Sequence, residues 1–198
     1  MESKPSRAEA KNATRERVLR TASRAVRRDG IAGMGVAAVM AESGLTHGGF
    51  YAHFPSKDAL VAAAIDSAFA ESRRKLAATV ADADPVVALT NWIDFYVTAR
   101  HRDDRARGCA LTALSAEATR SSAVATDALG RGVASLTGSL AGWLAAAGRR
   151  DADAIATAML SEAVGAVTLA RVLGPTQASD VLLAATRASL RQRAGIVQ

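Results

Sequence analysis

The chain has 198 residues, of which 49% are hydrophobic and 22% charged, a composition typical of a soluble globular protein. Only 4% are aromatic, so a core must be built from small and aliphatic side chains, which favours closely packed helices over a β-sandwich. The single cysteine, Cys109, excludes an internal disulfide, and the charged first thirty residues do not resemble a signal peptide. The most apolar stretch, residues 154–170, contains Glu162 and is shorter than the ~20 apolar residues that span a bilayer. We therefore expect an all-α, cytoplasmic protein with no membrane partner.

The excess positive charge is confined to the N-terminal end. The formal net charge is +6, and residues 1–28 account for all of it with nine basic and three acidic side chains. A polyanion would be attracted to that end, and counterion release would make its binding depend on salt. Charge alone is equally compatible with a solvated basic tail.

The first predicted elements are a flexible basic arm over residues 1–12 and a helix that starts at Ala13. Apolar residues recur on one face of this helix at spacings of three to four. Asp29-Gly30 is expected to end it, since Gly30 suits the left-handed position after a helix. A basic stripe follows another side of the helix: Arg17, Arg20, Arg24 and Arg27.

Two short helices are expected next, one over residues 36–42 and one that begins at Thr46. The turn between them, Ser43-Gly44-Leu45, calls for a residue that tolerates positive φ, and Gly44 provides it. Two short helices joined by such a turn form the motif that places its second helix in the major groove of DNA. Phe50 and Phe54 are expected to fill the core of this unit. The pattern therefore predicts a helix-turn-helix domain over residues 13–57.

The run GLTHGGFYAHFPSKDAL, residues 44–60, resembles the recognition-helix signature of the TetR/AcrR repressors. The helix over residues 15–30 is similar to that family's first helix, and the resemblance covers about residues 13–65. Two positions depart from it: Gly35 stands where Thr or Ser usually opens the second helix, and Met40 where alanine is more usual.

The resemblance implies contacts with a double-stranded DNA operator from six residues: Thr46, His47, Gly48, Tyr51, His53 and Lys57. Few of these side chains can make bidentate base contacts, so DNA shape would carry part of the specificity. Tyr51 could instead serve only in packing. His47 and His53 have no cysteine or carboxylate cluster beside them, so we expect neither a metal nor a cofactor.

Residues 58–198 are predicted to form an all-helical ligand-binding and dimerisation domain. Ser56 is suited to cap a helix over residues 56–81, and Asp84-Pro85 to begin another that runs to about His101. Residues 100–107 are expected to form an exposed charged loop, followed by helices over residues 108–119, 122–147, 151–173 and 177–193.

The family resemblance implies that helices within residues 56–173 enclose a pocket and that the last two helices pair with those of a second subunit. Small and apolar side chains on these two helices are compatible with such a homodimer, or with ordinary core inside one chain. They are Ala154, Ala158, Val164, Val167, Leu182, Leu183 and Leu190.

Several residues are candidates for binding an unknown small-molecule inducer. Trp92, Phe95 and Tyr96 share one side of a predicted helix, and they form either pocket walls or core. Glu162 lies within an apolar helix, where it would either pair with a cationic ligand or be exposed.

Cys109 is a candidate for chemical sensing. It is expected at the start of a helix near Arg105 and Arg107, a setting that would lower the pKa of its thiol. The pattern Gly108-Cys109-Ala110-Leu111, with Glu117 after it, resembles a branch of the family that responds to electrophiles through such a cysteine. The alternative is a small buried residue that only packs.

The sequence shows no nucleophile–base pair, paired carboxylate motif or phosphate-binding glycine loop, so we do not expect an enzyme. We predict a ligand-responsive transcriptional regulator, a repressor that binds a palindromic operator as a dimer and is released by a small-molecule or electrophilic inducer. A nucleoid-type DNA-binding protein without a ligand is one alternative, and an activator is another.

Overall fold

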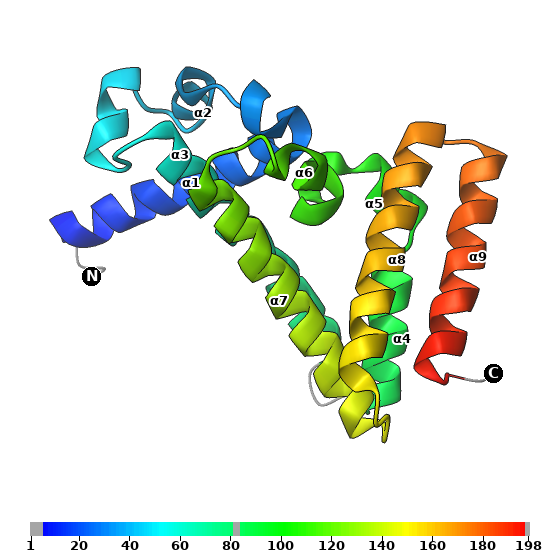
Figure 1. Ribbon diagram of the computed structural model, residues 1–198. Helices are drawn as coiled ribbons and strands as arrows, with labels where there is room; N and C mark the ends of the chain where they lie inside the picture. Colours follow the sequence, from blue (N-terminus) through cyan, green and yellow to red (C-terminus); the bar gives the residue numbers. More distant parts are fainter. Residues whose placement is uncertain (1–5, 81–83, 197–198) are drawn as a thin grey trace, which may run out of the picture.

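The computed structural model describes residues 6–80 and 84–196, and all regular secondary structure in these ranges is helical (Figure 1). The predicted all-α class is confirmed. The elements are α1 (Arg7–Gly33), α2 (Val36–Glu42), the 3-10 helix η1 (His47–Ala52), α3 (Lys57–Val80), α4 (Pro85–Tyr96), α5 (Ala99–Asp103), the 3-10 helix η2 (Arg105–Arg107), α6 (Ala110–Ala118), α7 (Ala123–Ala146), α8 (Ala152–Leu173) and α9 (Gln177–Ala194).

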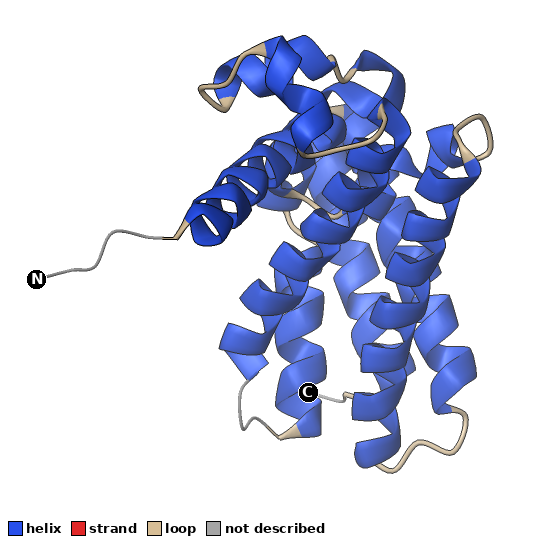
Figure 2. Ribbon diagram, turned by 90° about the vertical axis from the view of Figure 1, so that its left-hand side faces the viewer, coloured by secondary structure: helices blue, strands red, loops and turns tan. Residues whose placement is uncertain are grey.

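The molecule consists of a small head and a longer helical body. The head contains α1, α2 and η1, and α3 leads from it into the body. In the body α3 packs against α7, α7 against α8 and α8 against α9, so that long helices run side by side below the head (Figure 2). The first turns of α1 project beyond the body (Figure 1). One continuous apolar core joins head and body, because α1 packs along α3.

Helix α1 begins at Arg7, six positions earlier than predicted. The Ser6 hydroxyl accepts a hydrogen bond from the Glu9 N–H at 3.2 Å, and the Glu9 carboxylate accepts one from the Ser6 N–H at 2.6 Å. This capping box satisfies two donors at the helix start and fixes it there. The predicted flexible arm is therefore wrong for residues 7–12, and residues 1–5 lie outside the described residues.

Several predicted helix ends are confirmed by their hydrogen bonds. The Ser56 hydroxyl accepts from the Ala59 N–H at 3.1 Å, and the Asp84 carboxylate accepts from the Val86 N–H at 2.8 Å. Gly35 caps α2 with no side-chain bond. Gly44 has a φ of +70°, the left-handed conformation that the turn before η1 requires.

The predicted helix to His101 and the exposed loop over residues 100–107 are both wrong. Helix α4 ends at Tyr96 because Val97 leaves the helical conformation, and the Thr98 hydroxyl then caps α5 by accepting from the His101 N–H at 3.1 Å. His101 and Arg102 are buried. Arg102 is held there by the Ser179 hydroxyl and the Asp180 carboxylate of α9, each at 2.9 Å.

The last two helices pack closely against each other within the chain. Val167, Leu183 and Leu190, three of the residues predicted on the pairing face, are intrachain core. Other apolar side chains on these helices are exposed, among them Leu169, Val172 and Val181. Helix α8 is long and apolar enough to cross a membrane by length and composition alone, but its buried side chains pack against α5, α6, α7 and α9.

Candidate nucleic-acid interface and ligand pocket

Helix η1 lies on the surface of the head, and it and the turn that follows contribute aromatic side chains to the core beneath. Phe50 and Phe54 are each 2% exposed and stack with ring centroids 6.0 Å apart, as core residues should. Tyr51 packs edge-on against Phe50 at 5.1 Å, yet it remains 73% exposed. The contact with Phe50 orients the ring, and its exposed hydroxyl is placed where it could bond a phosphate. Packing within the chain therefore does not explain why so large a part of the Tyr51 side chain is exposed.

The six residues predicted to contact DNA lie on one short segment, from Thr46 just before η1 to Lys57, the first residue of α3. Thr46, His47, Gly48 and Lys57 are exposed like Tyr51, and the Lys57 ammonium donates to the Ala32 carbonyl at 3.3 Å. His53 is half-buried, and within residues 6–80 and 84–196 its Nδ1 atom has no hydrogen-bond partner. The expected recognition helix is a six-residue 3-10 helix, and Thr46 precedes it without a side-chain capping bond.

Helix α1 supports this surface from below. The Arg17 guanidinium donates to the Ser43 carbonyl at 2.9 Å, which ties α1 to the turn between α2 and η1. The Arg15 guanidinium lies 5.0 Å from the centre of the Phe54 ring, a cation–π contact. Arg17, Arg20 and Arg24 form an exposed stripe as predicted, whereas Arg27 is buried and belongs to a different site.

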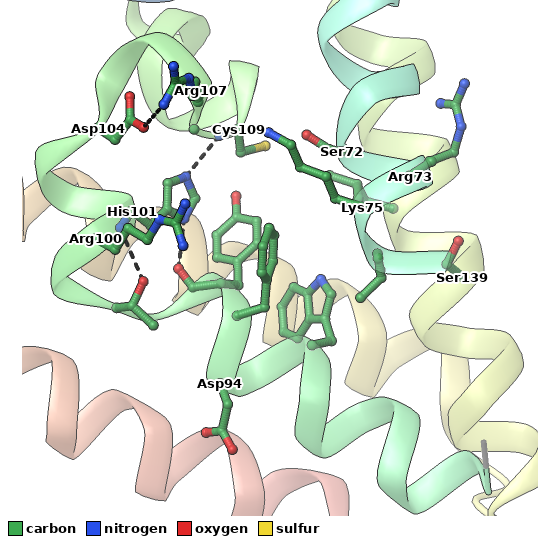
Figure 3. Close-up of a pocket in the computed structure, with 17 residues that line it drawn as sticks. Ser72, Arg73, Lys75, Asp94, Arg100, His101, Asp104, Arg107, Cys109 and Ser139 are labelled. Carbon is green, nitrogen blue, oxygen red and sulfur yellow. Dashed lines mark hydrogen bonds and ion pairs between the residues drawn. The ribbon is translucent and has the colours of Figure 1, made fainter. Parts of the chain in front are cut away.

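A cavity of about 310 Å³ lies in the body between α3, α4, α7 and the segment from α5 to Cys109 (Figure 3). Its apolar wall includes Leu76, Leu136 and the three aromatic residues predicted from the sequence, Trp92, Phe95 and Tyr96. Trp92 and Tyr96 are buried and stacked with ring centroids 5.1 Å apart, while Phe95 is 46% exposed. The structure thus brings these three residues and Cys109 to one pocket.

Glu162 does not lie at this pocket. Its carboxylate pairs with the Arg193 guanidinium of α9 at 3.3 Å. The carboxylate therefore already has a cationic partner within the chain, and the predicted role in ligand binding is not supported.

Cys109 lies in the pocket wall, where it precedes the first turn of α6. It is buried, and burial raises the pKa of its thiol, although a hydrogen bond from Tyr96 acts in the opposite direction. Arg107 does not reverse this because its guanidinium faces the Asp104 carboxylate at 3.7 Å. The expected low pKa is therefore wrong: desolvation has the largest effect on the thiol, and the arginine that opposes it is Arg171 of α8, not Arg105 or Arg107.

We expect the Cys109 thiol of the folded protein to react with iodoacetamide at pH 7.5 at least about tenfold more slowly than in the unfolded chain, because burial limits both access and thiolate formation. The measurement is the rate of mass increase in buffer and in guanidinium chloride, with Cys109→Ser as the unlabelled control. Equal rates in the two solvents would show an accessible, activated thiol.

Two family models match the chain. Residues 18–64 match "Bacterial regulatory proteins, tetR family", and residues 85–187 match "Transcriptional regulator LmrA/YxaF-like, C-terminal domain". The chain belongs to the TetR family. Proteins of this family are DNA-binding transcriptional regulators and not enzymes.

Solved structures of TetR-family regulators share the fold. One from Cytophaga hutchinsonii has a TM-score of 0.81 at 20% identity, covering 99% of this chain and 98% of that one. Reduced NemR of Escherichia coli has a TM-score of 0.78 at 20% sequence identity, over 91% of this chain and 96% of NemR. A regulator from Chloroflexus aurantiacus has a TM-score of 0.78 at 24% identity, over 92% of this chain and 94% of that one. A search of curated proteins finds no match.

His101 fixes the pocket wall of this TetR-family protein, a role that the sequence did not suggest. Its Nδ1 atom bonds the Tyr96 carbonyl at 2.7 Å, and its Nε2 atom accepts from the Cys109 N–H at 2.8 Å. Burial lowers the pKa of His101 to about 4, so the ring is neutral at physiological pH. Both nitrogens are occupied, and the ring therefore holds the end of α4 against the start of α6.

A set of contacts that we call the junction joins the head to the body; it comprises Arg27, Ile31, Gly108 and Glu117. The buried Arg27 of α1 donates to the Gly108 carbonyl at 2.9 Å and to the Glu71 carboxylate of α3 at 2.7 Å. The Glu117 carboxylate of α6 accepts from the Ile31 N–H at 2.8 Å, just after Gly30 kinks α1 with a φ of +81°. Gly108 also lines the pocket, so Arg27 bonds the pocket wall directly.

Among the described residues, no three His, Cys, Asp or Glu side chains gather closely enough to hold a metal ion.

Proposed function

We propose that this TetR-family protein is a cytoplasmic, ligand-responsive repressor that binds a palindromic operator as a homodimer and is released by a small molecule. The observation that carries the proposal is the 2.9 Å bond between Arg27 of the DNA-binding head and the carbonyl of Gly108 in the pocket wall. A ligand that displaces the wall must disturb this bond.

The proposed mechanism has two states. In the operator-bound state each subunit presents η1 to the major groove, with the two half-sites about 34 Å apart. Thr46, His47, Gly48, Tyr51, His53 and Lys57 are the proposed contacts. A ligand releases DNA only if it binds the pocket of the released state more tightly than that of the operator-bound state.

The test uses DNA that flanks the protein's own coding sequence, together with sheared genomic DNA and a random fragment as control. The repressor should bind one fragment selectively, and Tyr51→Ala should weaken that binding about tenfold without unfolding the protein, since Tyr51 is largely exposed. Affinity equal to that for random DNA across a salt series would instead support the nucleoid-type alternative. Transcription from the bound promoter in vitro separates a repressor from an activator.

A homodimer through α8 and α9 is supported by the apolar side chains that these helices expose. Leu169 and Val181 are more than half exposed, and Val172 is 81% exposed. Large apolar side chains gathered on two adjacent helices are typical of a subunit interface. Their burial against a second copy would produce the four-helix arrangement that the family resemblance implies.

We expect the double variant Val172→Asp/Val181→Asp to be monomeric and to bind the operator about 100-fold more weakly, because an interface cannot bury unpaired carboxylates and a monomer engages one half-site. Sedimentation velocity and operator titration provide the two readouts. The matched control is Val124→Asp/Val133→Asp on α7, where both valines are also exposed. A double variant that sediments as a dimer would contradict this interface.

A further inference from the structure

The ligand pocket combines an aromatic wall with an unbalanced positive charge. Its lining contains four cationic side chains, Arg73, Lys75, Arg100 and Arg107, but two carboxylates, Asp94 and Asp104. Both carboxylates already have partners, since Asp104 faces Arg107 at 3.7 Å and Asp94 pairs with Arg191 of α9. A cationic ligand would therefore find no free carboxylate in the pocket lining.

Two of the cations retain charge that a ligand could use. No ion pair to Arg100 is found among residues 6–80 and 84–196. Lys75 bonds the Glu71 carboxylate at 2.7 Å, but Glu71 also bonds the buried Arg27, so that one negative charge faces two positive charges. Lys75 and Arg100 extend into the pocket from opposite sides, whereas Arg73 points away from its interior (Figure 3).

The Tyr96 hydroxyl adds a hydrogen-bond donor to this pocket. It is buried, and its one partner among the residues that the structure describes is the neighbouring Cys109 thiol, a weak hydrogen-bonding group. Burial raises the pKa of Tyr96 well above its usual value, so the phenol stays protonated and can donate. His101 cannot supply this bond to a ligand because both of its ring nitrogens are engaged within the chain.

We propose that the pocket binds an aromatic carboxylate, with its flat apolar body against Trp92 and Tyr96 and its anionic group between Lys75 and Arg100. The cavity of about 310 Å³ is at the small end of the range for ligand sites, which suits a body of one or two fused rings. Carboxylates take strong charge-assisted bonds from guanidinium and ammonium groups. The inference rests on the proposed function only for its consequence, the release of DNA.

The test compares three probes that share one ring system and differ in the charge of one group: 2-naphthoate, 2-naphthamide and 2-naphthylmethylamine. Binding to the full chain is measured by calorimetry and by quenching of tryptophan fluorescence. We expect 2-naphthoate to bind about tenfold more tightly than the amide, and the amine to bind most weakly. Its affinity should also fall as salt increases.

Substitutions of single residues test which cationic side chains of the pocket bind the carboxylate. Arg100→Gln and Lys75→Gln should each weaken binding of 2-naphthoate about tenfold and leave that of 2-naphthamide unchanged. Arg74→Gln is the matched control, because Arg74 lies next to the pocket residues of α3 but is exposed and outside the lining. It should leave both affinities unchanged.

The proposal would be overturned by equal affinity for the acid and the amide, by tightest binding of the amine, or by no binding of any probe. It would also be overturned if Arg74→Gln weakened binding of 2-naphthoate as much as Arg100→Gln and Lys75→Gln do. A separate titration asks whether 2-naphthoate releases the operator. Tight binding without release leaves the ligand class standing and counts against the ligand-responsive repressor. Binding of the probes is measured without DNA, so failure to find an operator does not affect it.

Discussion

Replacing Arg27 with methionine is expected to lower the free energy of unfolding by about 3 kcal/mol and to abolish ligand-induced release of the operator. The guanidinium is fully buried, and its removal leaves the Gly108 carbonyl and the Ser23 hydroxyl without their donor. Glu71 is partly exposed and still has its ion pair with Lys75 in the variant. The expected loss of stability is therefore at the lower end of the range for a broken buried ion pair. Urea denaturation and operator titration, with and without a compound that releases the wild type, measure the two effects.

Arg28→Met is the matched control for Arg27→Met. Arg28 follows Arg27 in α1 but is exposed and pairs with its neighbour Asp29, so its loss should cost less than about 1 kcal/mol and leave release intact. If Arg27→Met were equally mild and released DNA normally, the junction would have no part in the response.

The second large effect expected is a loss of about 3 kcal/mol of stability as the pH falls from 6.5 to 4, caused by His101. The unfolded chain takes up a proton on this histidine near pH 6.5, whereas the folded chain does so only near pH 4, because burial disfavours the charged ring. The stabilisation that the neutral, buried His101 ring gives to the folded state is therefore fully present above pH 6.5 and is lost progressively as the pH falls towards 4.

Urea denaturation over this pH range checks the expectation. The His101→Asn variant should lack this component and show a flatter dependence on pH than the wild type. His47→Gln, which removes an exposed histidine, is the control and should retain the wild-type dependence. Parallel curves for the wild type and His101→Asn would assign the acid sensitivity to other groups.

The head could be predicted from the sequence because its determinants are local. The spacing of apolar residues in α1, the turn at Gly44 and the aromatic pair Phe50 and Phe54 each act within a few residues of one another. The early start of α1 could also have been read, since Ser6 and Glu9 have the spacing of a capping box.

The pocket wall could not be predicted in the same way because distant residues decide it. The segment after Tyr96 is rich in charge and resembles an exposed loop, yet Arg102 is buried by Ser179 and Asp180, more than 70 positions away. The pKa of Cys109 follows from burial rather than from the arginines near it in sequence. Periodicity shows which residues share a helix face, but it does not show which partners will cover that face.

The atom that Arg27 contacts has a consequence for how the proposed ligand response could be redirected to another compound. Arg27 bonds a main-chain oxygen at Gly108, and every residue type carries such an oxygen. Side chains of the pocket can therefore be exchanged, by evolution or by design, while the hydrogen bond between Arg27 of the DNA-binding head and the pocket wall is retained. A biosensor with a new inducer is best sought among variants of the α3, α4 and α7 positions that line the cavity, with α1 left untouched.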